Sequence, residues 1–282
     1  MEPPTVSIVI PTLNSARYID YCIRSVFNQT FRDFEVIVVD GGSVDDTLSR
    51  ISKYDVKIIR AKPGRSWQKN IGAYNARGEY IYFLDSDFYI GSKVIEECVN
   101  KCRNGFDAIV IGLLPWIDKS FLGRVLFWHK IYTSKCSVKV AARFMRREVF
   151  LSVGGFDNSL YFNEDLDLHR RIRNGGYRIG YVDSYQYHLG ESRSIGEYIR
   201  RYLYYAPNIG LYVKHNPRES ILHIASIHHI LKAFRETPSK LIPYILALEI
   251  IRLTTIIIGY IVGNVKYMKA GLYKAITRIL RC

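Results

Sequence analysis

The first half of the chain alternates short apolar runs with amphipathic segments, and this alternation constrains the fold more than any other feature. The apolar runs have the length and composition of buried strands, and they occupy residues 6–10, 34–39, 57–60, 80–84 and 108–111. Segments with helical periodicity lie between them, at residues 16–28, 45–53, 67–76 and 93–104. A strand that is apolar on both sides needs covering helices on both faces of its sheet. The sequence therefore predicts an α/β fold with a mostly parallel sheet and helices on both faces.

The second half of the chain is less regular. Residues 113–132 are rich in Trp, Phe and Leu, which is typical of either a core helix or a helix lying on a membrane surface. Two consecutive glycines, Gly175 and Gly176, end a preceding helical pattern. The predicted elements are strands at residues 140–145 and 178–182, a helix at 164–174, and two amphipathic helices at 194–214 and 219–234.

Residues 241–263 are the candidate for a membrane segment, because they are nearly all apolar and long enough to cross a hydrocarbon core of roughly 30 Å. Glu249 and Arg252 lie within them at a spacing that lets the two charges pair on one helix face. A buried helix of a soluble domain is the alternative, but a basic tail without acids follows directly and favours a membrane surface. A single span and a bent or half-embedded segment both remain open. The basic tail contains Lys266, Lys269, Lys274, Arg278 and Arg281.

These segments divide the chain into three predicted regions. Residues 1–192 form the α/β domain, residues 193–239 form interfacial helices, and residues 240–282 form the membrane-associated helix and basic tail. The N-terminus lacks the basic and apolar regions of a secretory signal, so we expect the α/β domain in the cytoplasm. Five cysteines without a CxxC motif fit a reducing compartment and indicate neither a zinc site nor a disulfide framework. The formal charge of +14 favours anionic partners, which include nucleic acid, acidic lipids and diphosphates.

The motif Asp85-Ser86-Asp87 follows the apolar run 80–84, at the expected carboxyl end of a buried strand. Two carboxylates at such a position are costly unless a cation compensates them. Mg²⁺ or Mn²⁺ does this when it bridges one or two carboxylates and a diphosphate. A solvated turn is the alternative, which the strongly apolar preceding strand disfavours. The motif therefore predicts a divalent-metal site.

Three other motifs fall where such a sheet would place a ligand. The segment PTLN at residues 11–14 leads from the first strand into a helix, whose N-terminal amides can receive an anionic group. Asp40 and two glycines follow the second strand, and the acid there is placed to accept hydrogen bonds from a base or ribose. Glu164 and Asp165 open a predicted helix, where one of them can act as a general base. Taken alone, each motif also fits an ordinary cap or turn.

Taken in order, the motifs resemble family 2 glycosyltransferases of the GT-A fold. The resemblance rests on SIVIPTLN, DGGSVDD, GRSWQKNIGAYNARGEYIYFLDSD, GGFD and NEDLDLHRRIRNGGYRI, followed by His188. It covers residues 6–188. The C-terminal third resembles the reduced membrane part of cellulose-synthase-like and archaeal membrane-bound members.

The resemblance implies roles for the matching positions. Asp165 would be the catalytic base, and Glu164 would orient acceptor or donor hydroxyls. Asp87 would coordinate the metal, Asp85 would face the ribose and metal, and His188 would reach the metal or the diphosphate, although a lone histidine is often simply packed. The nucleotide would be bound by Pro11, Thr12, Asn14, Asp40 and Arg65, and the leaving diphosphate by Arg201. Arg201 lies where processive relatives carry a Gln-x-x-Arg-Trp motif, and the departure from its Gln and Trp puts polysaccharide-synthase activity in doubt.

The implied function is metal-dependent, inverting transfer of a hexose such as mannose or glucose. The donor would be of the GDP-mannose or UDP-glucose type, the cofactor Mg²⁺ or Mn²⁺, and the acceptor a lipid-linked molecule or glycan at the cytoplasmic face of a membrane. The alternative is a membrane-bound nucleotide-sugar sensor or scaffold without catalysis. A Rossmann dehydrogenase is disfavoured because no GxGxxG follows the first strand. Nucleic-acid binding is disfavoured because the basic cluster lies beside an apolar segment and not on a recognisable reader fold.

Overall fold

The computed structural model describes residues 2–116, 120–134, 141–160, 163–192, 194–215 and 237–258. The chain divides into two compact units, of which the first comprises Met1–Ile117 and Thr133–Glu191, and the second Asp118–Tyr132 and Ser192–Cys282. The boundaries of the three regions expected from the sequence stay a prediction.

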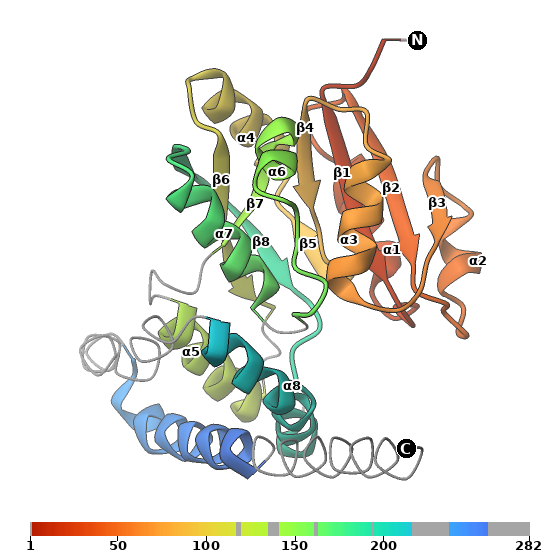
Figure 1. The fold of residues 1–282 in the computed structure, drawn as a ribbon. Coiled ribbons are helices and arrows are strands. Elements are labelled where there is room, and N and C mark those ends of the chain that lie inside the picture. The colour runs from red at the N-terminus through yellow and green to blue at the C-terminus, as the bar shows by residue number, and fades with distance from the viewer. Residues whose placement is uncertain are drawn as a thin grey trace, which may run out of the picture. The chain divides into compact units, whose positions relative to one another are not determined.

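The first unit is built on one mixed sheet with the strand order β3-β2-β1-β4-β7-β6-β8-β5 (Figure 1). Strands β1 to β4 pair in parallel, as do β6 and β8. Strand β7 is antiparallel to β4 and β6, and β5 is antiparallel to β8. The strands are β1 Val6–Thr12, β2 Phe34–Asp40, β3 Lys57–Arg60, β4 Tyr80–Phe83, β5 Phe88–Ile90, β6 Ala108–Pro115, β7 Ala142–Arg146 and β8 Ile179–His188.

Helices cover both faces of this sheet, so the predicted fold class is confirmed. One core packs α1 and α4 against the sheet, and the other packs α3, α6 and α7 against its opposite face. Helix α1 buries Ile19, Cys22, Ile23 and Val26, whose spacing forms one apolar stripe. Cys98 and Cys102 of α4 are buried as small apolar groups. The helices are α1 Ile19–Phe27, α2 Thr47–Ile51, α3 Arg65–Tyr74, α4 Val94–Arg103, α6 Arg147–Ser152 and α7 Glu164–Asn174.

Several elements differ from the prediction. Strand β8 continues to His188, well past the predicted end at residue 182, because it is paired with β6 on one side and with β5 on the other. Strand β6 extends to Pro115, so the first residues of the stretch read as a helix at 113–132 are extended chain. The short strand β5 and helix α6 were not predicted. Strand β5 is held by its pairing with β8, and α6 by the burial of Val149 and Phe150. Elements this short leave little periodic signal in the sequence.

The second unit is helical in its described part. It contains α5, Phe121–Ser134, α8, Ile195–His215, and residues 242–258, which form a helix after the short turn Ser239–Leu241. Its apolar contacts centre on Val125, Tyr198, Ile245 and Leu248. The predicted helix at 219–234, residues 259–263 of the apolar segment and the basic tail lie outside the described residues.

A polar group lies within this helical unit. Nε2 of His129 lies 2.9 Å from Oε2 of Glu249, and Nε of Arg252 donates to the same oxygen at 2.8 Å. Nη2 of Arg252 donates to Oε1 of Glu249. The predicted pairing of Glu249 with Arg252 is therefore confirmed.

Candidate active site

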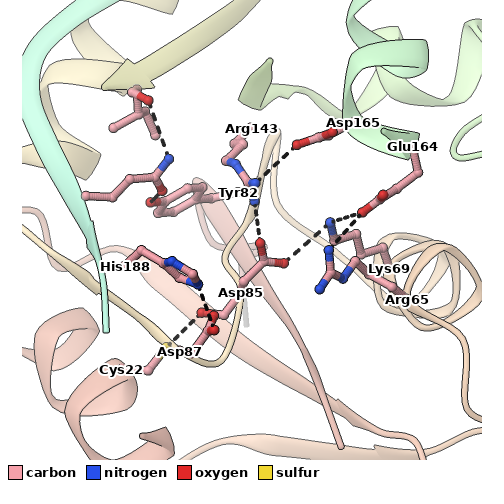
Figure 2. Close-up of polar contacts among 12 residues, drawn as sticks. Cys22, Arg65, Lys69, Tyr82, Asp85, Asp87, Arg143, Glu164, Asp165 and His188 are labelled. Carbon is pink, nitrogen blue, oxygen red and sulfur yellow. Dashed lines mark hydrogen bonds and ion pairs between the residues drawn. The ribbon is translucent and has the colours of Figure 1, made fainter. Parts of the chain in front are cut away.

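Arg143 of β7 is the centre of the site, because it bridges two acids from distant segments (Figure 2). Its Nη1 donates a hydrogen bond to Oδ2 of Asp85 at 2.8 Å, and its Nη2 donates to Oδ2 of Asp165 at 3.2 Å. Asp85 follows the carboxyl end of β4, whereas Asp165 lies in the first turn of α7. The guanidinium lies 5.0 Å from the ring centroid of Phe88. Arg143 thus brings a predicted metal-side acid and the predicted base into one site.

Lys69 forms a second bridge, between Asp85 and Glu164. This lysine of α3 is fully buried, and its Nζ lies 3.2 Å from Oε1 of Glu164 and 3.5 Å from Oδ1 of Asp85. Arg65, at the start of the same helix, places Nη1 3.7 Å from Oε1 of Glu164. A buried ammonium group is costly unless it is paired. The two carboxylates therefore compensate the charge of Lys69 within the core.

These cations govern the ionisation of Asp85. Burial acts to raise the pKa of its carboxyl group, but Lys69, Arg143 and Arg65 hold that pKa well below its usual range. Burial likewise acts to lower the pKa of Arg143, and the charges of Asp85 and Asp165 raise it above its ordinary value. Asp85 and Arg143 are therefore both charged at neutral pH.

His188, the last residue of β8, contacts Asp87. Its Nε2 lies 3.0 Å from Oδ2 of Asp87, and its Nδ1 lies 2.6 Å from Oε1 of Glu191. The two residues meet because β5 pairs with β8 in a register that sets Phe88 opposite His188. Burial acts to raise the pKa of Asp87, but the neighbouring His188 brings it below its usual value. The sequence-predicted pair Asp87 and His188 is thus assembled by the pairing of β5 with β8.

The loop after β8 lies against Asp87. The amide of Leu189 donates to the carbonyl of Asp87 at 2.8 Å. A Cβ atom on Gly190 would lie 2.2 Å from Oδ2 of Asp87, closer than van der Waals contact permits. Glycine at position 190 therefore allows the loop to approach the carboxylate.

The loops after β1 and β2 are joined by hydrogen bonds. Oδ2 of Asp40 accepts from the amides of Gly42 and Ser43, each at 3.0 Å. Asn14 has a left-handed backbone, with φ of 49°, and its Oδ1 accepts from the amide of Val44 at 2.9 Å. The Asp40 carboxylate thus stabilises its own turn, and its contact with a nucleobase stays a prediction.

Gln68 of α3 ties the ends of β1 and β2 together. Its Nε2 donates to the carbonyls of Thr12 and Val39 at 2.8 and 2.7 Å. Pro11 lies within β1, opposite Val39. Oγ1 of Thr12 is buried and has no hydrogen-bond partner among the described residues, whereas Oδ1 of Asp85 has an ion pair with Lys69 at 3.5 Å. Buried polar atoms without partners are rare, and at a strand end they mark where a ligand can supply the missing bond.

A family model for Glycosyl transferase family 2 matches residues 7–156, which is more than half of the 282 residues. The chain belongs to this family. It is 30% identical over 193 residues to glycosyltransferase GlyG of Streptococcus pneumoniae, a match that covers 58% of this chain and 64% of GlyG. It is 34% identical over 111 residues to the GalNAc(5)-diNAcBac-PP-undecaprenol beta-1,3-glucosyltransferase of Campylobacter jejuni, covering 36% of each protein. The chain thus spans less than two thirds of both curated relatives.

A solved structure shares the fold of this family 2 chain. The mannosyltransferase PcManGT of Pyrobaculum calidifontis, in complex with GDP-Man and Mn²⁺, matches with a TM-score of 0.61 at 18% identity. The match covers 95% of this chain and 88% of PcManGT. The GT-A fold expected from the sequence is therefore confirmed.

Most site residues that the family resemblance implied take part in the contacts described above. Two residues of these contacts, Lys69 and Arg143, were not predicted. Lys69 lies on the buried side of α3 with Ser66, Asn70 and Ala73, so helical periodicity could have placed it inside. Arg143 gave no such signal, because β7 has only five residues and contains a second arginine, Arg146, so the pattern does not single out Arg143. Arg201 lies in α8 of the second unit, and its predicted contact with the leaving diphosphate stays a prediction.

Part of this site contains side chains of the kind that bind a divalent cation. The described residues contain no group of three or more His, Cys, Asp or Glu side chains that could hold a metal ion. Asp87 and His188 lie side by side, whereas Asp85 already pairs with Lys69 and Arg143. Mg²⁺ and Mn²⁺ often take one or two carboxylates and complete their coordination with substrate phosphates and water. The residues thus fit a cation that binds together with a diphosphate.

Proposed function

We propose that this chain transfers a hexose from a nucleoside-diphosphate sugar to an acceptor hydroxyl with inversion at the anomeric carbon. The donor is of the GDP-mannose or UDP-glucose type, and Mg²⁺ or Mn²⁺ assists its binding. Membership of glycosyl transferase family 2 supports the reaction class. PcManGT, which shares the fold and was solved with GDP-Man and Mn²⁺, supports the donor type and the metal.

One observation carries the proposal: Arg143 joins Asp85 to Asp165. In the proposed reaction the donor occupies the carboxyl ends of β1, β2 and β4, where Thr12 and Asp85 have buried oxygens that lack hydrogen-bond partners within the described part of the chain. The acceptor lies on the side of Asp165. The Arg143 bridge supports this arrangement, because it connects the donor side and the base within a single site.

The reaction is a single displacement. Asp165 removes the proton from the acceptor hydroxyl as that oxygen attacks the anomeric carbon. The bond between the anomeric carbon and the diphosphate oxygen breaks on the opposite face, which inverts the configuration. Arg143 orients Asp165 for this step, since among the described residues the carboxylate otherwise accepts a hydrogen bond only from the Leu166 amide, at 2.9 Å.

Asp87 and His188 would hold the cation, which would neutralise charge on the leaving diphosphate. Arg65 is half exposed at the start of α3, where its guanidinium can reach the donor phosphates. Glu164 holds Lys69 and Arg65 in place, and it orients hydroxyls of the bound sugars.

We also propose that the second unit attaches the protein to a membrane, where a lipid-linked or glycan acceptor is available. Ser239–Ile258 is, by length and composition, a helix that can cross a bilayer. It exposes a set of large apolar side chains, which includes Leu246, Ile250, Leu253, Ile257 and Ile258. The Campylobacter jejuni relative, whose name specifies an undecaprenol-linked substrate, supports a lipid-linked acceptor. Attachment at the cytoplasmic face stays a prediction.

Asp165→Asn tests the proposed function. The amide cannot accept the proton, so transfer should fall by roughly 10²- to 10⁴-fold while donor binding is retained. Nucleotide release with GDP-mannose and UDP-glucose measures transfer, calorimetry with Mn²⁺ measures donor binding, and NMR of the product gives the anomeric configuration. Near-normal turnover in Asp165→Asn would show that another group is the base. Donor binding by the wild type without release from any donor would favour the sensor or scaffold.

A further inference from the structure

A row of aromatic side chains lies beside the proposed active site and plays no part in the reaction described above. It crosses β5, β8 and the end of β6, and we call it the aromatic row: Tyr89, Trp116, Tyr181, Tyr185 and Tyr187.

The strand registers place the aromatic row on one face of the sheet. Tyr181 is the register partner of Val110, and Val110 packs in the core that contains α3, α6 and α7. Two and four residues further along β6, Gly112 and Leu114 point to the same side and are the partners of Tyr185 and Tyr187. Tyr89 pairs with Tyr187, and Trp116 continues the alternation after Leu114. The row therefore lies on the face that carries α7, whose first turn contains Asp165.

Three of the rings contact one another. The centroids of Trp116 and Tyr187 are 6.1 Å apart in an edge-to-face arrangement, and Tyr89 lies 6.3 Å from Tyr187 and 6.5 Å from Trp116. Trp116 is nevertheless 57% exposed. These contacts fix the orientation of the rings while leaving the indole accessible.

The ring of Tyr185 packs against the backbone of Gly112. A Cβ atom at Gly112 would be 2.6 Å from Cδ1 and 2.7 Å from Cε1 of Tyr185, so the ring covers the space that a side chain at 112 would fill. The residue is 47% exposed, which means that its outer face is open to solvent. Tyr181, further back along β8, is 63% exposed. Glycine at position 112 thus makes room for the Tyr185 ring, which stays half exposed beside the sheet.

The aromatic row meets the active site at His188. Tyr187 directly precedes His188, and the amide of Trp116 donates to the carbonyl of His188 at 2.9 Å. The His188 side chain in turn contacts Asp87. The His188 side chain lies on the opposite face of β8 from Tyr187, so a chain lying on the row would reach the edge of the sheet at which the reaction site lies.

We propose that the aromatic row binds the carbohydrate chain of the acceptor, an inference that rests on the proposed glycosyl transfer. The C–H faces of sugar rings pack on aromatic rings, and tyrosine adds a hydroxyl that hydrogen-bonds to sugar hydroxyls. The β6 partners of Tyr181 and Tyr187, Val110 and Leu114, are four residues apart, so the row extends roughly 13 Å along the sheet, enough for two or three sugar rings. Asp183, exposed between them at an irregularity of β8, offers a carboxylate to further hydroxyls. That carboxylate would repel an anionic lipid surface, so the row favours a glycan.

Ligand-observed NMR with mannotetraose, cellotetraose and maltotetraose tests the row directly. We expect at least one tetrasaccharide to bind the wild-type chain. Its affinity should fall roughly fivefold to tenfold in Trp116→Ala and Tyr185→Ala, because each removes a stacking face. Tyr185→Phe keeps the ring and should lose much less. Tyr21→Ala removes an exposed tyrosine from α1, away from the row, and should bind like wild type. Failure of all three sugars to bind, or equal binding by Trp116→Ala and wild type, would overturn the proposal.

Two further measurements separate this proposal from others. Nucleotide release from GDP-mannose or UDP-glucose reports on the proposed function alone, so its absence in the wild type would count against glycosyl transfer and not against sugar binding. Sedimentation with phosphatidylglycerol vesicles reports on membrane contact. Loss of vesicle binding in Trp116→Ala with unchanged sugar affinity would assign the row to the membrane and overturn the proposal.

Discussion

The two units of the molecule both bury ion pairs, but they build them from different parts of the chain. In the second unit, Glu249 and Arg252 are three residues apart on one helix, and His129 of α5 adds one further contact. In the first unit, the group around Arg143 combines the end of β4, the strand β7 and the first turn of α7. Helical periodicity alone predicts the first kind of pair, whereas the second depends on the topology of the sheet.

The two groups also differ in how completely they are satisfied. Both oxygens of Glu249 accept hydrogen bonds, so that group is closed. In the first unit, Oγ1 of Thr12 lacks a hydrogen-bond partner within the described ranges, and Oδ1 of Asp85 has an ion pair with Lys69 at 3.5 Å but no hydrogen bond there. A group of side chains whose hydrogen bonds are all satisfied contributes to packing. A group with an unsatisfied polar atom can bind a ligand. We therefore expect changes in the first group to alter ligand binding, and changes in the second to alter stability alone.

Arg143→Gln should have the largest effect. It leaves Asp85 and Asp165 without their shared cation, and breaking such a buried pair costs about 3–5 kcal/mol of unfolding free energy. Transfer should fall as well, because Asp165 loses its orientation. Urea unfolding and nucleotide release measure the two effects. Arg146→Gln is the control on the same strand, because its partner Glu79, at 2.8 Å, is exposed; with the hydrogen bond to the Cys102 carbonyl it should cost about 1–2 kcal/mol, less than Arg143→Gln. Equal unfolding free energies of the two variants would show that the Arg143 ion pairs stabilise the protein no more than that of Arg146, and would contradict a central role for Arg143.

Glu249→Gln should lower stability by about 1–3 kcal/mol, since it leaves the Arg252 charge without its partner in a partly buried position. Donor affinity should not change. Thermal unfolding in detergent measures the first effect, and calorimetry with the donor measures the second. Weaker donor binding in this variant would contradict the conclusion that the Glu249–Arg252 group contributes to stability alone.

Gly190→Ala should act on ligand binding alone. The added Cβ atom would displace Oδ2 of Asp87, and we expect Mn²⁺-dependent donor binding to weaken about tenfold, which is about 1.4 kcal/mol. Gly196→Ala is the control, because its Cβ atom would meet nothing closer than 3.8 Å. Calorimetry with and without Mn²⁺ makes the comparison. Unchanged binding would argue against a cation held by Asp87.

Glu35→Gln should have the smallest effect, because it alters an ion pair of the first unit that lies outside the site. Burial acts to raise the pKa of Glu35, but hydrogen bonds from Ser7 and Arg77 lower it below its usual value. The stabilisation is therefore present above the unfolded pKa of about 4.3 and is lost as pH falls through the folded value. The wild type should be more stable than the variant by about 1 kcal/mol or less at pH 7. Urea unfolding should show that this difference shrinks below about pH 4. A stability difference between wild type and variant that grows as the pH falls would show that folding raises the pKa of Glu35 and does not lower it.

Much of the first unit was predictable from local patterns. The strand at 57–60 and the helix at 164–174 have the predicted bounds; Gly175 and Gly176 end the helix. The helix bounds at 16–28 and 93–104 were only a few residues too wide. The family resemblance, drawn from ordered motifs, correctly indicated the GT-A fold.

The sequence by itself determined which acids stand at strand and helix ends, because those positions follow from periodicity along the chain. It also determined the Glu249–Arg252 pair, which needs only one helix. The tertiary structure alone decided that β5 pairs with β8 and that Arg143 lies between Asp85 and Asp165. The physical reason is that such contacts join segments many residues apart, and neither spacing nor propensity within one segment specifies which distant segment will lie beside it.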